Sequence, residues 1–264
     1  MLHVELHYSM TESADSSFSS VAAYYEYLMS GVPYRFWVRH IDRYWTSVGH
    51  EPKRILDLAT GTGTVARLLA QRGKTVVGVD LSASMLEIAE KRAVEDGVSI
   101  DWRRQDMSEL DLPGKTFDSA ICLFDSINYV LEETRFKDAL QRVGRHLRSG
   151  GTFVFDMNAE LAFQLGMFNQ SCSRKDEPLH YRWRQRYNED TKLCTVRMRF
   201  VYRPVDGSVE QIFHEVHKQR AYSKDDVVTW LGEAGFHSIT VTDSYSDCEA
   251  TPDSDRLVFH AIKG

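Results

Sequence analysis

The sequence predicts an α/β fold in which a seven-stranded, mostly parallel sheet is covered by helices on both faces. Short, nearly continuous apolar runs alternate with helical segments from residue 54 to residue 156. That alternation is typical of parallel strands buried on both faces. Between residues 177 and 220 the pattern changes to polar–apolar alternation with turn sequences, which indicates an antiparallel β insertion before the last helix.

The N-terminal part is predicted to form a tail and two helices. Residues 1–20 are rich in serine and acidic side chains, so we expect a flexible tail. Aromatic and aliphatic residues recur at helical spacing over 21–45, and Gly31-Val32-Pro33 separates two helices. The next five strands are expected at 54–59, 75–79, 99–103, 117–124 and 152–156. The helices between them are expected at 65–72, 83–96 and 132–147, the last one ended by Gly150 and Gly151.

The C-terminal part returns to the large sheet after the insertion. The inserted strands are expected at 179–187, 193–203 and 208–220, with turns at 188–190 and 204–207. A helix over 224–234 follows, with Ser223 as its N-cap and Gly235 at its end. The last two strands are expected at 237–243 and 256–262.

Length and charge narrow the class of protein. A chain of 264 residues with 42% hydrophobic residues suits one large domain, here 21–176 with 221–264, and an insertion at 177–220. The net charge of −6 argues against a large phosphate-binding surface, and therefore against a nucleic acid partner. Arginines alternate with aromatics over 181–187, a pattern that can bind a nucleic acid backbone. We favour the other interpretation, a two-sided strand with its arginines in solvent.

Cysteine usage and hydropathy indicate a cytoplasmic protein. The four cysteines are widely spaced and include no C-x-x-C motif, so they offer no zinc site. His214 and His217 would point to opposite faces of a strand, which argues against a shared metal. No apolar run approaches the ~20 residues that span a bilayer, and no signal peptide pattern is present. We expect no membrane partner, and a homodimer is left open.

The loop after the first strand is the most informative stretch. Gly61 and Gly63 let the backbone turn tightly and approach a ligand closely. The N-terminal amides of the following helix point at that ligand. The glycines alone also fit a dinucleotide-binding loop, so the choice of cofactor depends on the acids that follow.

Two acids follow the second and third strands. Asp80 stands where a carboxylate can bind the hydroxyl pair of a ribose, although Asp80 or Ser82 can instead cap the next helix. Asp106 is placed to accept a hydrogen bond from an adenine amino group, and Met107 offers its amide and an apolar contact to the ring. Together these positions predict an adenosine-containing cofactor.

Five segments then resemble class I S-adenosylmethionine-dependent methyltransferases in order and spacing: LDLATGTGTVARLLA, VVGVDLSASMLEIAEKR, RRQDM, FDSAICLFDSINYV and HLRSGGTFVFD. Thr64 stands where the family usually has a third glycine, as in the branch that methylates small molecules. The resemblance implies S-adenosyl-L-methionine as cofactor, an N-terminal helical lid and a Rossmann-like sheet in the order 3-2-1-4-5-7-6. The residues that it places around the cofactor are Tyr25, Asp57, Ala59, Gly61, Gly63, Asp80, Leu81, Met85, Asp106, Met107 and Leu123.

The methyl acceptor is expected beyond the ends of the fourth and fifth strands. Asp125 is our catalytic candidate, to orient or deprotonate an amine, and the alternative is a helix cap. The string CLFDS resembles glycine and sugar-amine N-methyltransferases. Residues 156–159 lack the arginine with which some glycine N-methyltransferases hold a carboxylate, so the resemblance favours a cationic or neutral acceptor. The substrate contacts expected from the same loops are Ser126, Asn128, Tyr129 and Asn158.

The predicted function is methyl transfer to a small molecule, with an amine nitrogen as the acceptor. Transfer from a sulfonium needs mainly positioning and exclusion of water. Three alternatives remain open at this point. They are a methyltransferase acting on tRNA or protein, a nicotinamide-dependent oxidoreductase that uses the same loop, and a cofactor-binding protein without catalysis.

Overall fold

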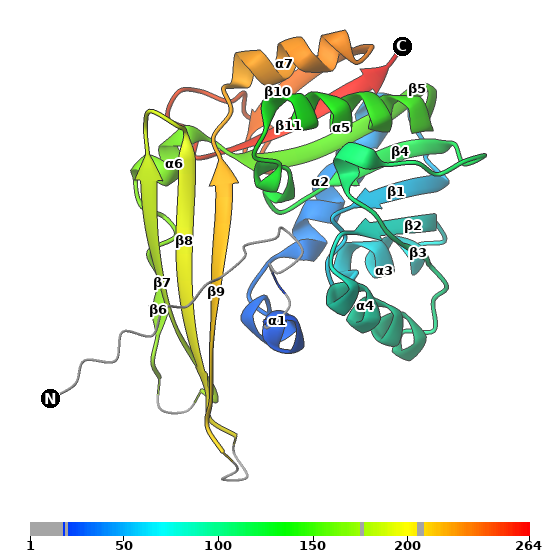
Figure 1. The fold of residues 1–264 in the computed structure, drawn as a ribbon. Coiled ribbons are helices and arrows are strands. Elements are labelled where there is room, and N and C mark those ends of the chain that lie inside the picture. Colours follow the sequence, from blue (N-terminus) through cyan, green and yellow to red (C-terminus); the bar gives the residue numbers. More distant parts are fainter. Residues whose placement is uncertain (1–17, 19–20, 175–176, 205–208) are drawn as a thin grey trace, which may run out of the picture.

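The chain forms two sheets that lie side by side (Figure 1). The computed structural model describes residue 18 and residues 21–174, 177–204 and 209–264. The predicted tail therefore lies outside the described residues apart from Phe18, and so do residues 205–207 of a predicted turn. The larger sheet has seven strands and the smaller one has four.

The larger sheet has the strand order β3-β2-β1-β4-β5-β11-β10, which confirms the predicted order. Only β11 runs antiparallel to its neighbours, so its first residue meets the carboxyl ends of the parallel strands. The strands span β1 Arg54–Leu58, β2 Thr75–Asp80, β3 Asp101–Arg104, β4 Phe117–Cys122, β5 Leu147–Asn158, β10 Phe236–Asp243 and β11 Arg256–Lys263.

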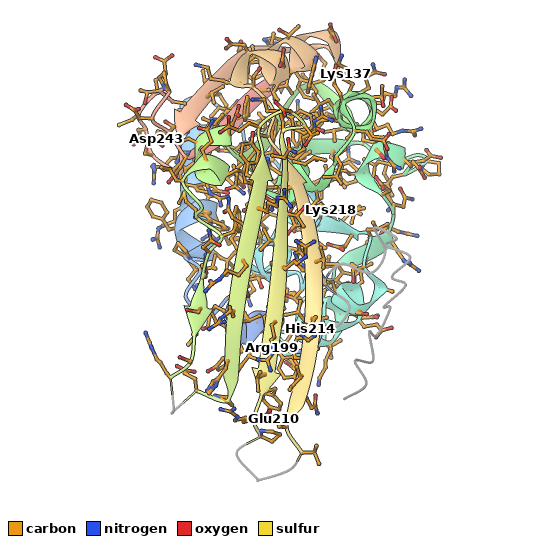
Figure 2. All side chains as sticks on the ribbon, turned by 60° about the vertical axis from the view of Figure 1, so that its left-hand side comes forward. Lys137, Arg199, Glu210, His214, Lys218 and Asp243 are labelled. Carbon is orange, nitrogen blue, oxygen red and sulfur yellow. The ribbon has the colours of Figure 1, made fainter. Side chains whose placement is uncertain are left out.

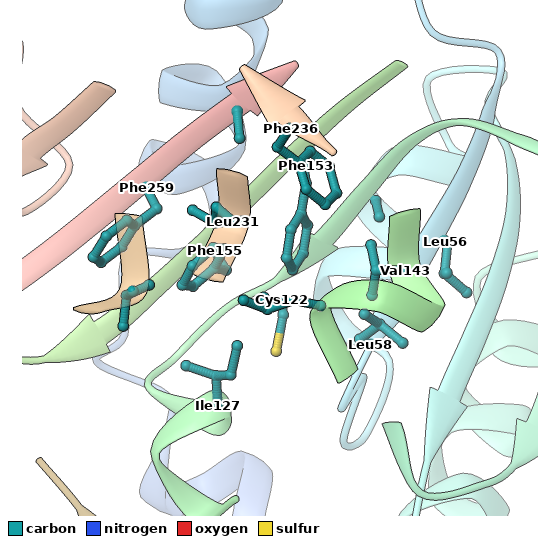
Figure 3. Packing of buried hydrophobic residues seen from close by; sticks show 14 of the residues in the cluster. Leu56, Leu58, Cys122, Ile127, Val143, Phe153, Phe155, Leu231, Phe236 and Phe259 are labelled. Carbon is teal, nitrogen blue, oxygen red and sulfur yellow. The ribbon is translucent and has the colours of Figure 1, made fainter. Parts of the chain in front are cut away.

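Helices cover both faces of this sheet. Successive strand residues point to opposite faces, and both sets of side chains are apolar, so each face packs against helices. Leu56 packs in a cluster with α5 and α7, part of which Figure 3 shows, whereas Ile55 packs with α2 and α3. The helices span α1 Ala22–Leu28, α2 Tyr34–Ser47, α3 Thr64–Ala70, α4 Ala83–Glu95, α5 Glu133–His146, α6 Glu160–Gln164 and α7 Lys224–Glu233. Within the described residues, no helix has the length and apolar character needed to cross a bilayer.

Two predicted helix ends have different outcomes. Ser223 caps α7 by accepting a hydrogen bond from the Asp226 amide, as expected. The predicted glycine end of α5 is wrong: α5 ends at His146, and the chain continues directly into β5. A Cβ at Gly151 would lie 2.8 Å from the carbonyl oxygen of Arg148, so that glycine serves a close backbone approach instead.

The smaller sheet has the order β6-β7-β8-β9 and is antiparallel throughout. Its strands span β6 Ser171–Cys172, β7 Leu179–Asn188, β8 Leu193–Tyr202 and β9 Gln211–Arg220. The three long strands were predicted, and β6 was not, because two residues are too few to show a period. One face of β7 to β9 packs against residues of α1 and α6, and the other face is exposed.

Helix α1 lies between the two sheets (Figure 1). Glu26 fixes it to the larger sheet's helices through ion pairs with Arg67 of α3 at 3.1 Å and Arg92 of α4 at 2.9 Å. On the other side, the amide of Val21 donates a hydrogen bond of 2.8 Å to Glu215 of β9. Helix α1 is therefore tied to both sheets, through Val21 at its start and Glu26 nearer its end.

Candidate functional site

A cavity of about 820 Å3 opens where the parallel strands end and extends under the inner face of the smaller sheet. Its wall on the larger sheet contains most of the predicted site residues: Tyr25, Ala59, Gly61, Asp80, Leu81, Met85, Asp106, Met107, Asp125, Ser126 and Tyr129. Asp57 and Leu123 line an adjoining cavity of about 40 Å3. The smaller sheet contributes Tyr181, Trp183, Met198, Phe200, Glu215, His217 and Gln219.

The two glycines of the first loop have different roles. Both have a left-handed backbone, with φ of +58° at Gly61 and +73° at Gly63. A Cβ at Gly61 would meet no atom within 4 Å, and Gly61 lines the cavity, so the space beside it is free for a ligand. A Cβ at Gly63 would lie 2.5 Å from the ring of Trp102. Gly63 therefore serves packing at the start of α3, and it lines neither cavity.

Asp80 is held by the backbone at the end of β2. Its two carboxylate oxygens each accept a 2.8 Å hydrogen bond, one from the Gly61 amide and one from the Ser82 amide. Ser82, and not Asp80, caps α4 by accepting from the Met85 amide. Burial raises the pKa of Asp80 and, beneath it, raises the pKa of Asp57 to about 7. A carboxylate that faces the cavity with a lone pair free on each oxygen fits a ribose hydroxyl pair.

Asp106 begins the short 3₁₀ helix η2 (Met107–Glu109), which it caps through the Ser108 amide. Its second oxygen accepts a 2.8 Å charged hydrogen bond from Arg135 of α5. Asp106 and Met107 both line the cavity, so an adenine ring would meet a carboxylate already oriented by α5. Arg135 was not singled out from the sequence, because nothing in α5 marks one arginine among several.

The turn after β4 is the most constrained part of the site. Phe124 and Asp125 both have a left-handed backbone, with φ of 65° and 47°. Their amides donate to the buried carboxylate of Asp156 at 2.6 and 3.1 Å. The Tyr245 hydroxyl and Arg256 donate to the same carboxylate. The end of β5 thus holds the end of β4 in a conformation that a free chain avoids.

Asp125 points into the cavity and does not cap the next helix. Its carboxylate accepts hydrogen bonds from Arg256 at 2.9 Å and from Gln219 of β9 at 2.7 Å. The predicted alternative of a helix cap is wrong, since its side chain makes no capping bond to η3 (Ser126–Tyr129). Burial raises the pKa of Asp125 although Arg256 lies beside it.

Asn128 and Asn158 connect elements and do not line the cavity. The Asn128 amide group donates to the carbonyls of Asn158 and Arg220 at 3.2 and 2.9 Å. Asn158 donates to Gln219 at 3.1 Å and accepts from Arg256 at 3.2 Å. Both side chains are buried and fully engaged, so we assign them a positioning role in place of the predicted substrate contact.

A chain of polar side chains runs from η3 into the smaller sheet. The Tyr129 hydroxyl lies 2.9 Å from Nδ1 of His217, and Nε2 of His217 lies 2.6 Å from Glu215. All three line the cavity, and burial raises the pKa of Tyr129. His214 is exposed on the opposite face of β9, as its spacing from His217 predicted. In the described residues, no group of three or more His, Cys, Asp or Glu has metal-binding geometry.

Arg256, Gln219 and Glu215 are, like Arg135, site residues that the sequence did not reveal. Arg256 reaches the site because β11 is antiparallel and pairs Arg256 with Asn158 at the carboxyl end of β5. That position was available from the predicted topology, since an antiparallel last strand begins where the others end. The positions of Gln219 and Glu215 depend on how the two sheets pack, and no sequence pattern indicates that packing.

Comparisons with known proteins agree with this geometry. The profile of a family described as "Methyltransferase domain" matches residues 55–151. A putative methyltransferase of Geobacillus sp. (strain WCH70) is 32% identical over 94% of this chain and 100% of that protein. The crystal structure of an S-adenosylmethionine-dependent methyltransferase from Clostridium acetobutylicum is 27% identical, with a TM-score of 0.83 over 94% of this chain and 99% of that one.

A third relative concerns a different kind of acceptor. The demethylmenaquinone methyltransferase of Thermus thermophilus is 34% identical over 52% of this chain and 62% of that protein. All three relatives are methyltransferases, so the nicotinamide-dependent alternative is wrong. With the full-length relative and the cofactor-sized cavity at the strand ends, the chain belongs to the S-adenosylmethionine-dependent methyltransferases.

Proposed function

We propose that the protein methylates an amine nitrogen of a small molecule held between the end of β4 and the inner face of the smaller sheet. The observation that carries the proposal is one cavity that joins Asp80 to Asp125 and His217. A volume of about 820 Å3 is within the range that holds a nucleoside-sized cofactor together with a small acceptor. We also propose a cytoplasmic location, in keeping with four free cysteines.

The residues at the larger sheet fit S-adenosylmethionine. Gly61 leaves open space, Asp80 presents a fixed carboxylate, and Asp106 with Met107 forms the far wall. When bound, the cofactor supplies an electrophilic methyl group on a sulfonium, and its sulfur departs as a neutral thioether. The protein therefore has to position the acceptor and exclude water, which can lower the barrier by about 7–11 kcal/mol.

The charges around the acceptor region favour a cationic acceptor. Asp125, Asp156 and Glu215 are buried there, and Arg256 is the cation placed among them by the structure. Arg256 forms ion pairs with both Asp156 and Asp125. One cation therefore faces three buried carboxylates, and a net negative charge remains. A protonated amine at Asp125 would offset that excess, whereas a carboxylate would add to it.

An amine must lose a proton before its lone pair can attack. Tyr129 and His217 offer a route, because the tyrosine hydroxyl can pass a proton to Nδ1 of His217 while Glu215 stabilises the resulting imidazolium. In this scheme Asp125 orients the acceptor nitrogen, and the released proton ends on His217. The aromatic rings of Tyr181 and Trp183 exclude water above it.

Radiolabelled methyl transfer tests the proposal. The purified protein is incubated with methyl-labelled S-adenosylmethionine and matched panels of amines, quinols, carboxylates and bulk tRNA. We expect label in an amine. Label in a quinol alone would favour the kind of acceptor named for the Thermus thermophilus relative, and label in tRNA alone would favour a macromolecular acceptor; either result would overturn the amine assignment.

Asp125→Asn is the matched variant for this assay. It keeps the shape of the side chain and removes its charge, so we expect turnover to fall by roughly 10²–10³ while affinity for S-adenosylhomocysteine stays within about threefold. Unchanged turnover would remove Asp125 from the mechanism. Loss of cofactor affinity would instead show that Asp125 supports the cofactor end of the cavity.

A further inference from the structure

The outer face of the smaller sheet carries a set of arginines that the methyltransferase site does not use. In the antiparallel register Arg182 of β7 lies opposite Arg199 of β8, and Arg184 lies opposite Arg197. All four are exposed, as is Arg186 on the same face of β7. Figure 2 looks onto this face, where Arg199 lies beside His214 of β9, and Lys218 lies further along that strand, opposite Thr195. We call the five residues Arg182, Arg184, Arg186, Arg197 and Arg199 the arginine face.

On an ordinary solvated surface, acidic side chains offset the charge of nearby cations. Within the described residues, the arginine face has no such ion-pair partners. Like charges directly opposite each other on neighbouring strands are destabilising. Glu215 is the only acid in β7, β8 and β9, and it is buried on the inner face. Among the residues that the structure describes, none of the five arginines forms an ion pair with a carboxylate. Soluble surfaces usually intersperse both signs of charge, so this arrangement indicates an anionic partner.

We propose that the arginine face docks the phosphodiester backbone of RNA. Guanidinium groups bind phosphate oxygens through two parallel hydrogen bonds, and the arginine face presents five of these groups. Along β7 the arginines recur at every second residue, a spacing of roughly 6.8 Å. That spacing is close to the distance between successive phosphates of an extended strand. The net charge of −6 does not oppose this, because charges more than about 10 Å away are screened at 0.1 M salt.

The same face offers little for base recognition. The rings of Tyr181, Trp183 and Tyr187 alternate with the arginines and pack on the inner side of the sheet. Stacking platforms are what single-strand binders use to hold bases. The arginine face therefore contacts phosphates without reading sequence, and it lies across the sheet from the cavity. RNA bound there is a docking partner and not the methyl acceptor.

Fluorescence anisotropy with a short, labelled RNA of mixed sequence tests the proposal on the full chain. Five phosphate contacts on a single strand predict a slope of about −3.5 for log affinity against log salt, or about a hundredfold loss between roughly 50 and 200 mM. A second RNA of different sequence should bind with the same affinity. Vesicles of phosphatidylglycerol and vesicles of phosphatidylcholine form the other two arms.

The variant Arg184→Gln/Arg197→Gln removes the central facing pair. We expect its salt slope to fall by about 1.4 and its affinity at low salt to drop roughly fiftyfold. The control, Arg35→Gln/Arg39→Gln, removes two exposed arginines of α2 and should match the parent. No RNA binding at low salt, equal effects of both variants, or binding to anionic vesicles alone would each overturn the proposal. Methyl transfer takes no part in this assay, so its outcome is independent of the proposed function.

Discussion

The two sheets place functional residues by different means. In the larger sheet, site residues sit at strand ends, and backbone amides hold them, as the amides of Gly61 and Ser82 hold Asp80. In the smaller sheet three polar site residues stand within one strand, where Glu215, His217 and Gln219 share the inner face of β9 by simple alternation, and β7 and β8 add aromatic and apolar residues. The first arrangement is specific to one cofactor, whereas the second can change its ligand by exchanging single side chains. Under the proposed function, cofactor recognition and acceptor recognition are therefore separable in this molecule.

Replacing an arginine in each sheet gives the largest expected contrast. Arg256→Met would leave the buried carboxylates of Asp125 and Asp156 without their cation, at a cost of about 3–5 kcal/mol in the free energy of unfolding. Arg184→Met removes an exposed arginine and should change that free energy by no more than about 0.5 kcal/mol. Urea unfolding measures both. Equal effects would contradict the different roles of the two sheets' arginines.

A buried histidine pair gives the larger sheet a pH dependence. Nε2 of His40 on α2 lies 3.1 Å from Nε2 of His260 on β11, and burial lowers the pKa of His260 to about 4. The unfolded chain binds this proton below pH ~6.5, but the folded chain binds it only near pH 4, so stability is lost as pH falls through that window. The loss amounts to about 3 kcal/mol.

The urea concentration at the midpoint of unfolding, measured from pH 7 to pH 4, checks this prediction. That range covers the folded and unfolded pKa values of His260, about 4 and about 6.5. His260→Gln should flatten the profile because glutamine does not titrate. An unchanged slope in this variant would place the acid sensitivity elsewhere, for example in the smaller sheet.

The glycine loop separates packing from ligand binding within the larger sheet. Gly63→Ala strains a left-handed position and drives a methyl group into Trp102, for about 2–4 kcal/mol of lost stability. Gly61→Ala strains the backbone alone, for about 1 kcal/mol, but fills space beside the cavity. Thermal unfolding and calorimetric titration with S-adenosylhomocysteine distinguish the two. Weaker ligand binding by a folded Gly63→Ala protein, with none lost in Gly61→Ala, would reverse the assignment.

Most of the cavity wall on the larger sheet was predictable from sequence, and the wall on the smaller sheet was not. Strand ends in a parallel sheet converge on one edge, so the positions of Gly61, Asp80 and Asp106 follow from local patterns. Gly63 was assigned to the cofactor from its place in the loop and the family resemblance. Its packing partner, Trp102, comes from a strand two places away, which local patterns do not show. Asn128 and Asn158 were assigned to the acceptor because sequence does not show which polar side chains the protein itself engages.

In the smaller sheet, too, local patterns were predictable from sequence, whereas long-range packing was not. Its strands and their two-sided character followed from alternation, including the solvent-facing arginines of β7. Which face covers the cavity depends on contacts between α1, α6 and the sheet, which involve residues far apart in the chain. Net charge averages the arginine face with acids elsewhere, so it does not show where on the surface one sign of charge gathers.

Calorimetric titration with S-adenosylhomocysteine tests most directly whether cofactor binding belongs to the larger sheet alone. Asp80→Ala removes the carboxylate at the end of β2, and Trp183→Ala truncates a cavity residue of the smaller sheet. We expect S-adenosylhomocysteine to bind Asp80→Ala roughly a hundredfold more weakly, a loss of about 2.7 kcal/mol. For Trp183→Ala we expect a change within about threefold. Unchanged affinity in a folded Asp80→Ala protein, or an equal loss in both variants, would contradict this account.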